Sequence, residues 1–162
     1  MLKSRNKNSI RSHFLLIKKS SYSSGHRLLS ATEGAKALLE NRIWPLWKNT
    51  RCKNIVRPGH QVLIYLAGPE SDCGKVFASA RVQDVIDWSD RKHRPIYPLM
   101  LEGEPHKTLI LERRSYFQYP IAVAEQLDQL SFIPANKKKW GVAMMGGMRS
   151  LSASDYEVLS EK

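Results

Sequence analysis

Cysteine is scarce in this chain of 162 residues, which contains only Cys52 and Cys73. The two are not spaced like a redox pair or a metal ligand set, so the sequence excludes a disulfide scaffold and does not support a zinc site. Few cysteines are typical of a reducing compartment, which predicts a cytoplasmic protein. We expect neither a metal nor another cofactor.

Long apolar runs are missing too. No stretch approaches the roughly 20 residues needed to cross a bilayer, so no membrane insertion is expected. The sequence also lacks internal repeats and low-complexity tracts. A hydrophobic content of 42% in a chain of this length is enough to bury one core but hardly two, which predicts one globular domain.

Acidic residues are in short supply. The 15 Asp and Glu are outnumbered by 26 Lys and Arg, which gives a formal charge of +11 and an isoelectric point near 9.8. A cationic surface neutralises phosphates and releases their counterions, so a polyanionic partner is favoured, with nucleic acid as the leading candidate. Charge alone does not decide this, because many small basic proteins bind nothing specific.

The segment 1–11 contains Lys3, Arg5, Lys7 and Arg11 and no acid. This composition is typical of a flexible tail, but a transit peptide or an arm that contacts phosphates would share it. We therefore divide the chain into a basic N-terminal tail, 1–11, and a single domain, 12–162.

No group of residues typical of an active site is evident. The five histidines are scattered, and Asp84 with Asp87 is too weak a pair for general acid–base chemistry. We expect a protein that is not an enzyme. The enzymatic alternative is a lyase or hydrolase acting on a bound nucleotide.

Hydrophobic patterns predict a mixed α+β barrel. Strands are expected at 12–18, 61–67, 75–86 and 108–117, where short apolar or β-branched runs are bounded by turn residues. Leu and Ala at helical spacing predict a helix over 26–40, and shorter helices are expected at 121–130 and after a capping motif that begins at Ser152.

Two features near the first strand and the first helix suggest a ligand site. Trp44 follows the predicted helix among cations, where a large flat ring either fills the core or stacks on a planar ligand. The turn residues Ser20, Ser21 and Tyr22 follow the first strand. Their free backbone donors and hydroxyl groups either read the edge of a base or only complete a turn.

The order of several motifs matches one known family. These motifs are Ile17-Lys18-Lys19-Ser20, Ile43-Trp44, Val56-Arg57-Pro58-Gly59-His60 before Tyr65, Lys75-Val76-Phe77-Ala78 followed by Trp88, and a closing segment with Gly146-Gly147-Met148-Arg149 and Asp155-Tyr156. Over roughly residues 12–160 the chain resembles EVE-domain proteins of the PUA-like superfamily, although His60 replaces the Asp common after the Pro-Gly turn. The resemblance implies a PUA-like mixed β-barrel flanked by helices.

The chain is also similar to YTH domains, relatives in the same superfamily whose aromatic cage encloses a methylated adenine. EVE relatives are implicated in recognising modified bases, including modified cytosines. The resemblance implies a base-binding pocket with Trp44 and Trp88 as walls, formed by Ser20, Ser21, Tyr22, Trp44 and Trp88. For both tryptophans the alternative is burial in the core.

Cations close to this pocket in the sequence suit a path for the phosphate backbone. The candidates are Lys18, Lys19, Lys48, Arg51, Lys53 and Arg57, extended by Lys139 and Arg149. Trp47 is expected at the rim of the pocket or packed under its loop. Trp140, which follows three lysines, either stacks on a neighbouring base or anchors the terminal segment.

Two functions from different classes follow. One is a non-catalytic module that recognises a modified base, namely methylated or hydroxymethylated cytosine or methylated adenine, in DNA or RNA. The alternative is a general RNA-binding PUA-like module without modification specificity. A protein-interaction domain with fortuitous charge is a third possibility and predicts no binding at low salt. Any action beyond binding would come from an effector partner or from occlusion of the site.

Overall fold

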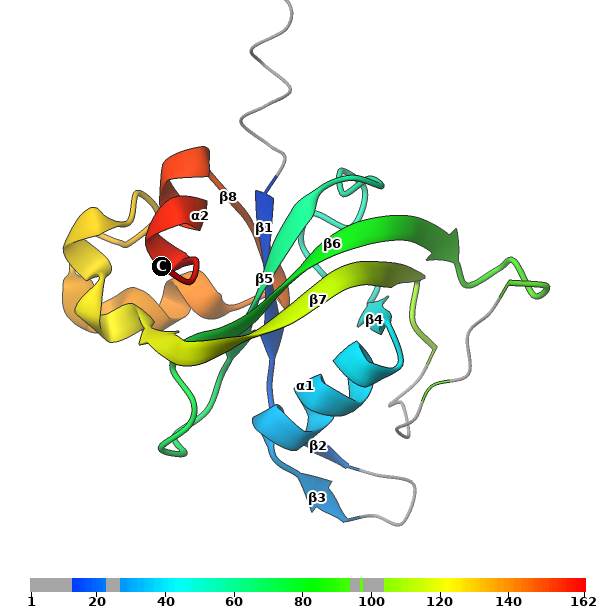
Figure 1. The fold of residues 1–162 in the computed structure, drawn as a ribbon, viewed down its shortest axis with the longest axis horizontal. Coiled ribbons are helices and arrows are strands. Elements are labelled where there is room, and N and C mark those ends of the chain that lie inside the picture. Colours follow the sequence, from blue (N-terminus) through cyan, green and yellow to red (C-terminus); the bar gives the residue numbers. More distant parts are fainter. Residues whose placement is uncertain (1–12, 23–26, 94–96, 98–103) are drawn as a thin grey trace, which may run out of the picture.

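The computed structural model describes residues 13–22, 27–93, 97 and 104–162. Within these residues the strands form a curled mixed sheet of six strands in the order β4-β7-β6-β5-β1-β8 (Figure 1). This arrangement confirms the expected α+β class. The predicted basic tail, 1–11, lies outside the described residues.

Strand β1 (His13–Lys18) lies inside the sheet, parallel to β5 (Gln61–Leu66) and antiparallel to β8 (Met148–Leu151). Its apolar run is continuous because both faces of the sheet are covered. Phe14 and Leu16 belong to one hydrophobic core, and Leu15 and Ile17 belong to a second core on the opposite face. The strands predicted at 12–18 and 61–67 are therefore confirmed, with Ser12 outside the described residues.

Strands β6 (Lys75–Asp87) and β7 (Lys107–Ala122) form a long antiparallel ribbon, and β7 also pairs with β4 (Ile43–Leu46). The β6–β7 register shifts at three points, and shifts of this kind accompany β-bulges, which bend a strand and increase the twist of a sheet. The sheet ends at β4 and β8, so its described strands form a half-barrel rather than a closed barrel.

The predicted helix at 121–130 is wrong. Ile121 and Ala122 still pair with β6, so the ladder extends past the point where helical spacing begins. The chain then turns through two short 3-10 segments, η2 (Val123–Glu125) and η3 (Leu127–Gln129), within the described residues. Pairing across the sheet overrides the local preference for a helix.

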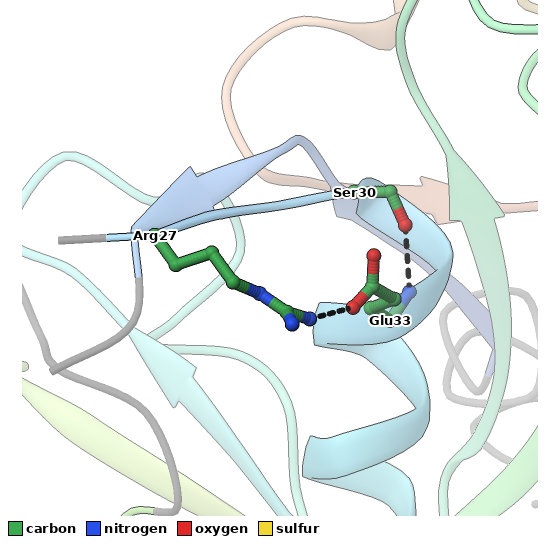
Figure 2. Close-up of polar contacts among 3 residues, drawn as sticks. All are labelled: Arg27, Ser30 and Glu33. Carbon is green, nitrogen blue, oxygen red and sulfur yellow. Dashed lines mark hydrogen bonds and ion pairs between the residues drawn. The ribbon is translucent and has the colours of Figure 1, made fainter. Parts of the chain in front are cut away.

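Helix α1 (Ala31–Glu40) packs on the first core, against the face that includes β4. Its start is fixed by Ser30, whose Oγ accepts a hydrogen bond of 3.1 Å from the backbone N–H of Glu33 (Figure 2). The Glu33 carboxylate also pairs with Arg27 at 2.6 Å. The helix predicted from 26 begins later because Leu28–Leu29 forms β3, paired with β2 (Ser21–Tyr22).

Helix α2 (Ala153–Leu159) and η4 (Lys137–Met144) cover the second core, on the other side of the sheet from α1 (Figure 1). The capping motif is confirmed: the Oγ of Ser152 accepts a hydrogen bond from the N–H of Asp155. The buried Asp155 carboxylate accepts bonds from the N–H and the hydroxyl of Ser131 at 2.8 and 2.5 Å. No helix in the described residues is long and apolar enough to span a membrane.

We expect Asp155→Ala to lower the free energy of unfolding by about 1.5–3 kcal/mol, because it removes hydrogen bonds to a charged acceptor. Urea denaturation measures this change. Ser154→Ala, an exposed substitution on the same turn, is the control and should change the free energy by less than about 0.5 kcal/mol. An equal effect of the two substitutions would contradict the structural role of Asp155.

Candidate functional site

A cavity of about 510 Å³ lies where the half-barrel is open, between the edge strand β4 and the segment that enters β8. It is surrounded by the end of β1, by β2, by α1 and by the loop that follows β4. The lining residues are Ile17, Lys18, Lys19, Ser20, Ser21, Tyr22, Leu38, Trp44, Pro45, Trp47, Asn49, Thr50, Gly146 and Gly147.

Backbone hydrogen bonds hold the two sides of this opening together. The N–H of Arg51, in the loop after β4, donates to the carbonyl of Gly146 at 3.1 Å. The N–H of Ile17, at the end of β1, donates to the carbonyl of Gly147 at 3.0 Å. The glycine pair therefore bridges the loop and β1, and it fixes the mouth of the cavity.

Glycine is required at position 146 by both conformation and space. Gly146 has a φ of 91°, which side chains rarely adopt, and a Cβ there would lie 2.8 Å from the Cδ of Arg51. Gly147 also has a positive φ, of 74°. These two residues allow the loop and the segment before β8 to approach closely.

The loop after β4 contains a turn closed by two hydrogen bonds. The N–H of Trp47 donates to the Oγ1 of Thr50 at 2.7 Å, and the N–H of Thr50 donates back to the Trp47 carbonyl at 3.0 Å. Because Thr50 is buried, this turn sets the position of the half-buried Trp47 at the cavity.

Aromatic side chains form much of the cavity wall. Trp44 lies on β4, opposite Leu109 of β7, and is only 3% exposed, so it belongs to the first core and also lines the cavity. Both sequence-based interpretations of Trp44, core filling and a wall open to a ligand, are thus compatible with its position. Trp47 adds a second indole, and Tyr22, which is 48% exposed, lies at the opening.

Trp88, predicted as the second wall, is not among the residues that line the cavity. Trp88 follows the last residue of β6, where its backbone N–H donates to the carbonyl of His106. The centre of its ring lies 6.1 Å from the centre of the Tyr97 ring. Since β7 separates β6 from β4, Trp88 lies roughly 10 Å from the β4 wall. The structure therefore does not bring Trp88 to the cavity, where Trp47 supplies the second indole.

The predicted residues of the first turn do come together at the cavity. Ser20, Ser21 and Tyr22 line it beside Trp44, as the resemblance implied. The Oγ of Ser21 accepts a hydrogen bond of 3.2 Å from the ammonium of Lys18, which also donates to the carbonyl of Lys19 at 2.6 Å. Burial lowers the pKa of Lys18 from its ordinary value.

Asn49 was not predicted as a site residue. Its carboxamide offers both a donor and acceptor, and it forms no hydrogen bond with the residues that the structure describes. The signal that could have pointed to Asn49 and Trp47 is their place in the cation-rich loop directly after Trp44.

Some of the predicted phosphate contacts lie close to the cavity. Lys18 and Lys19 line it, and Lys48 and Arg51 are exposed on the loop that includes Trp47 and Asn49. Lys53 folds back on the same loop, where its ammonium donates to the carbonyl of Lys48. Together Lys19, Lys48, Arg51 and Lys53 form what we call the rim cations.

The remaining predicted cations lie elsewhere. Arg57 is in the turn before β5, at the end of the sheet opposite to Lys18. Lys139 is on η4, over the second core. Arg149 faces inward: its guanidinium donates to the Ala143 carbonyl at 2.8 Å and lies 4.1 Å from the centre of the Phe132 ring. The structure therefore does not bring these three cations to the cavity.

Two further expectations concern residues away from the cavity. Trp140 is half-buried against the second core. This position corresponds to the alternative in which Trp140 anchors the terminal segment. Among the described residues, no cluster of His, Cys, Asp or Glu has an arrangement suited to a metal ion.

Comparison with known proteins identifies the fold. No family model and no curated protein matches the chain. Among solved structures, the N-terminal domain of McrB from Staphylothermus marinus superposes with a TM-score of 0.55 at 8% identity, over 94% of both chains. ASCH from Zymomonas mobilis gives 0.53 at 15% identity, over 93% of this chain and 98% of its own.

Human THYN1, in a complex with DNA that contains 5-methylcytosine, superposes with a TM-score of 0.54 at 14% identity. The match covers 90% of this chain and 93% of the human one. Identities this low show the fold alone. They confirm the PUA-like fold that the sequence resemblance implied.

Proposed function

We propose that this protein is a non-catalytic module that binds nucleic acid and holds one modified base in the cavity. The observation that carries the proposal is the cavity wall, in which Trp44, Trp47 and Tyr22 are combined with short polar groups and bordered by cations. The fold shared with human THYN1 bound to DNA containing 5-methylcytosine supports it.

The size of the cavity suits a single nucleotide. Its volume of about 510 Å³ falls within the roughly 300–1,000 Å³ typical of small-molecule sites. A base inside a duplex is stacked between its neighbours and would have to flip out to enter, whereas a base in a single strand is already accessible.

Aromatic side chains and polar groups of the cavity would have different roles in recognition. An indole stacks on any base, so the half-buried Trp47 supplies affinity without choosing a sequence, and Trp44, which is 3% exposed, completes the wall that the modified base meets. The hydroxyl groups of Ser20 and Ser21 and the carboxamide of Asn49 read the edge of the base. A methyl group on the base adds apolar area, which gives a modest discrimination of about 1–3 kcal/mol against the unmodified base.

The direct test is the binding of the full chain to matched oligonucleotides. They are unmodified or contain 5-methylcytosine, 5-hydroxymethylcytosine or 6-methyladenine, as single and double strands at two salt concentrations. Preference for one modified base supports the proposal and identifies its ligand. Equal affinity for all of them, falling as the salt concentration rises, would favour the general RNA-binding module. No binding at low salt would favour a protein-interaction domain.

We expect charge reversal of Lys19, Lys48 and Arg51 to weaken binding to every sequence alike. Each phosphate contact contributes about 0.7–0.9 to the slope of log affinity against log salt, so the slope should flatten by about 2–3. Titrations at several salt concentrations measure it. The control is Arg57→Glu, an exposed cation at the far end of the sheet, which should leave the slope nearly unchanged. Equal effects of the near and far reversals would exclude the rim cations as the phosphate path.

A further inference from the structure

We propose that Lys18 makes the cavity selective for uncharged modified bases and excludes those whose methylation creates a positive charge. The inference rests on the proposed function and names the class of base that the site accepts. It depends on three observations: the position of the Lys18 ammonium, the space made for it by α1, and the absence of carboxylates among the lining residues.

The Lys18 ammonium is held in place but is not neutralised. It donates to the Lys19 carbonyl at 2.6 Å and to the Ser21 hydroxyl at 3.2 Å. An ammonium has three N–H donors, so one has no acceptor among the described residues and is left for a ligand. Among the described residues, no ion pair involves Lys18.

Helix α1 leaves room for this side chain by means of a glycine. A Cβ at Gly34 would lie 3.0 Å from the Cε and 3.2 Å from the Nζ of Lys18, closer than most real contacts. Glycine inside a helix is less favourable than alanine, and a side chain at this position would press on the end of Lys18, which would have to shift by a few tenths of an ångström. The buried position also lowers the pKa of Lys18, as expected for a cation without a countercharge.

Among the residues that the structure describes, no carboxylate lines the cavity to offset this charge. The lining residues are apolar, aromatic, hydroxyl-bearing or amide-bearing, with Lys18 and Lys19 as the charged members. Aromatic walls alone attract cations through the faces of their rings. A fixed ammonium beside those rings reverses this preference, because a second positive charge would lie close to the first in a poorly solvated space.

The favoured ligand therefore presents an acceptor atom to Lys18. In an uncharged base this atom is a carbonyl oxygen or an unprotonated ring nitrogen. A phosphate oxygen of the same nucleotide has the same acceptor chemistry. The two sources differ in their consequences, because a contact to the base changes the choice among bases, whereas a contact to phosphate changes affinity for all of them.

Isomeric pairs of methylated bases provide the test. One pair is 5-methylcytosine, which is neutral, and 3-methylcytosine, which is cationic near neutral pH; the other is 6-methyladenine and 1-methyladenine, with the same contrast. Affinities for single-stranded oligonucleotides that contain each base are measured with the wild type and with Lys18→Met, which removes the charge and leaves an unbranched side chain one atom shorter. For each protein we take the ratio of its affinities for the two isomers of a pair. Comparing this ratio between the wild type and a variant cancels the steric difference between the isomers.

We expect the wild type to prefer the neutral isomer in the pair that fits the cavity and Lys18→Met to reduce this preference about tenfold or more. Lys18→Arg, which retains the charge, should preserve the preference. Lys48→Met, at the rim, should weaken binding to both isomers alike. Lys18→Gln is a second neutral variant, and circular dichroism shows whether each variant is folded.

Two results would overturn the inference while leaving the proposed function intact. One is that Lys18→Met and Lys18→Gln both keep the wild-type ratio of affinities for the two isomers, while each variant is folded and still prefers a modified to an unmodified base. The other is an equal loss for both isomers with a flatter salt slope, which would make Lys18 a phosphate contact. Failure of the wild type to prefer any modified base would overturn the proposed function and this inference together.

Discussion

Trp44→Ala is expected to lower the free energy of unfolding by about 3–5 kcal/mol and to abolish any preference for a modified base. The stability loss follows from burial: Trp44 is 3% exposed and packs among the residues of the first core. Removing the indole would leave a void between β4 and α1 that the surrounding side chains fill only in part. The binding loss follows because the same ring lines the cavity.

Stability and recognition are separated by two further variants at the tryptophans. Trp44→Leu retains apolar volume without an aromatic face, so it should be more stable than Trp44→Ala and should still lack the preference. Trp88→Ala is the control, because this half-buried tryptophan does not line the cavity and its loss should leave the choice of base unchanged. Urea denaturation and oligonucleotide titrations measure the two quantities. A folded Trp44→Leu protein with undiminished preference would assign Trp44 to the core alone.

Strands β1, β5, β6 and β7 could be predicted because their apolar patterns are local. The apolar run from Phe14 to Ile17 has the length of a strand and is bounded by polar residues, and Gln61–Leu66 follows a Pro-Gly turn. The cap of α2 was also visible, since a Ser followed three residues later by an acid satisfies the first free N–H groups of a helix.

The predictions that failed depend on contacts between distant segments. Leu28 and Leu29 continue the helical spacing of α1, but they pair with β2 instead. Ile121 begins an apparently helical segment, yet its partner is Val76 on β6. Local periodicity does not report such pairings, because the energy that selects them comes from residues remote in the sequence.

The candidate site also combines residues that local sequence could indicate with residues whose position depends on distant segments. Ser20, Ser21, Tyr22 and Trp44 line the cavity, and the sequence could single them out because they follow a recognisable strand or helix. Trp88 lies away from the cavity because β7 lies between β6 and β4, and the sequence pattern of β6 does not report this strand order. Contacts between the loop after β4 and the segment before β8 complete the cavity, and the register of the two edge strands sets these contacts.

Trp47→Ala is expected to weaken binding to the preferred modified oligonucleotide with little effect on folding. Stacking of one base on an aromatic ring contributes about 1–3 kcal/mol, which corresponds to a loss of affinity of roughly 5- to 150-fold. Trp47 is only half-buried and lies outside the first core, so the free energy of unfolding should fall by less than in Trp44→Ala.

The position of the Trp47 backbone should survive this substitution, because its N–H and carbonyl, rather than its ring, bond to Thr50. The matched control is Trp140→Ala, another half-buried tryptophan, which packs on the second core and does not line the cavity. Equilibrium titrations with modified and unmodified oligonucleotides, at one salt concentration, measure the effect. Equal losses of affinity in the Trp47 and Trp140 variants would show that the ring of Trp47 does not contact the bound base.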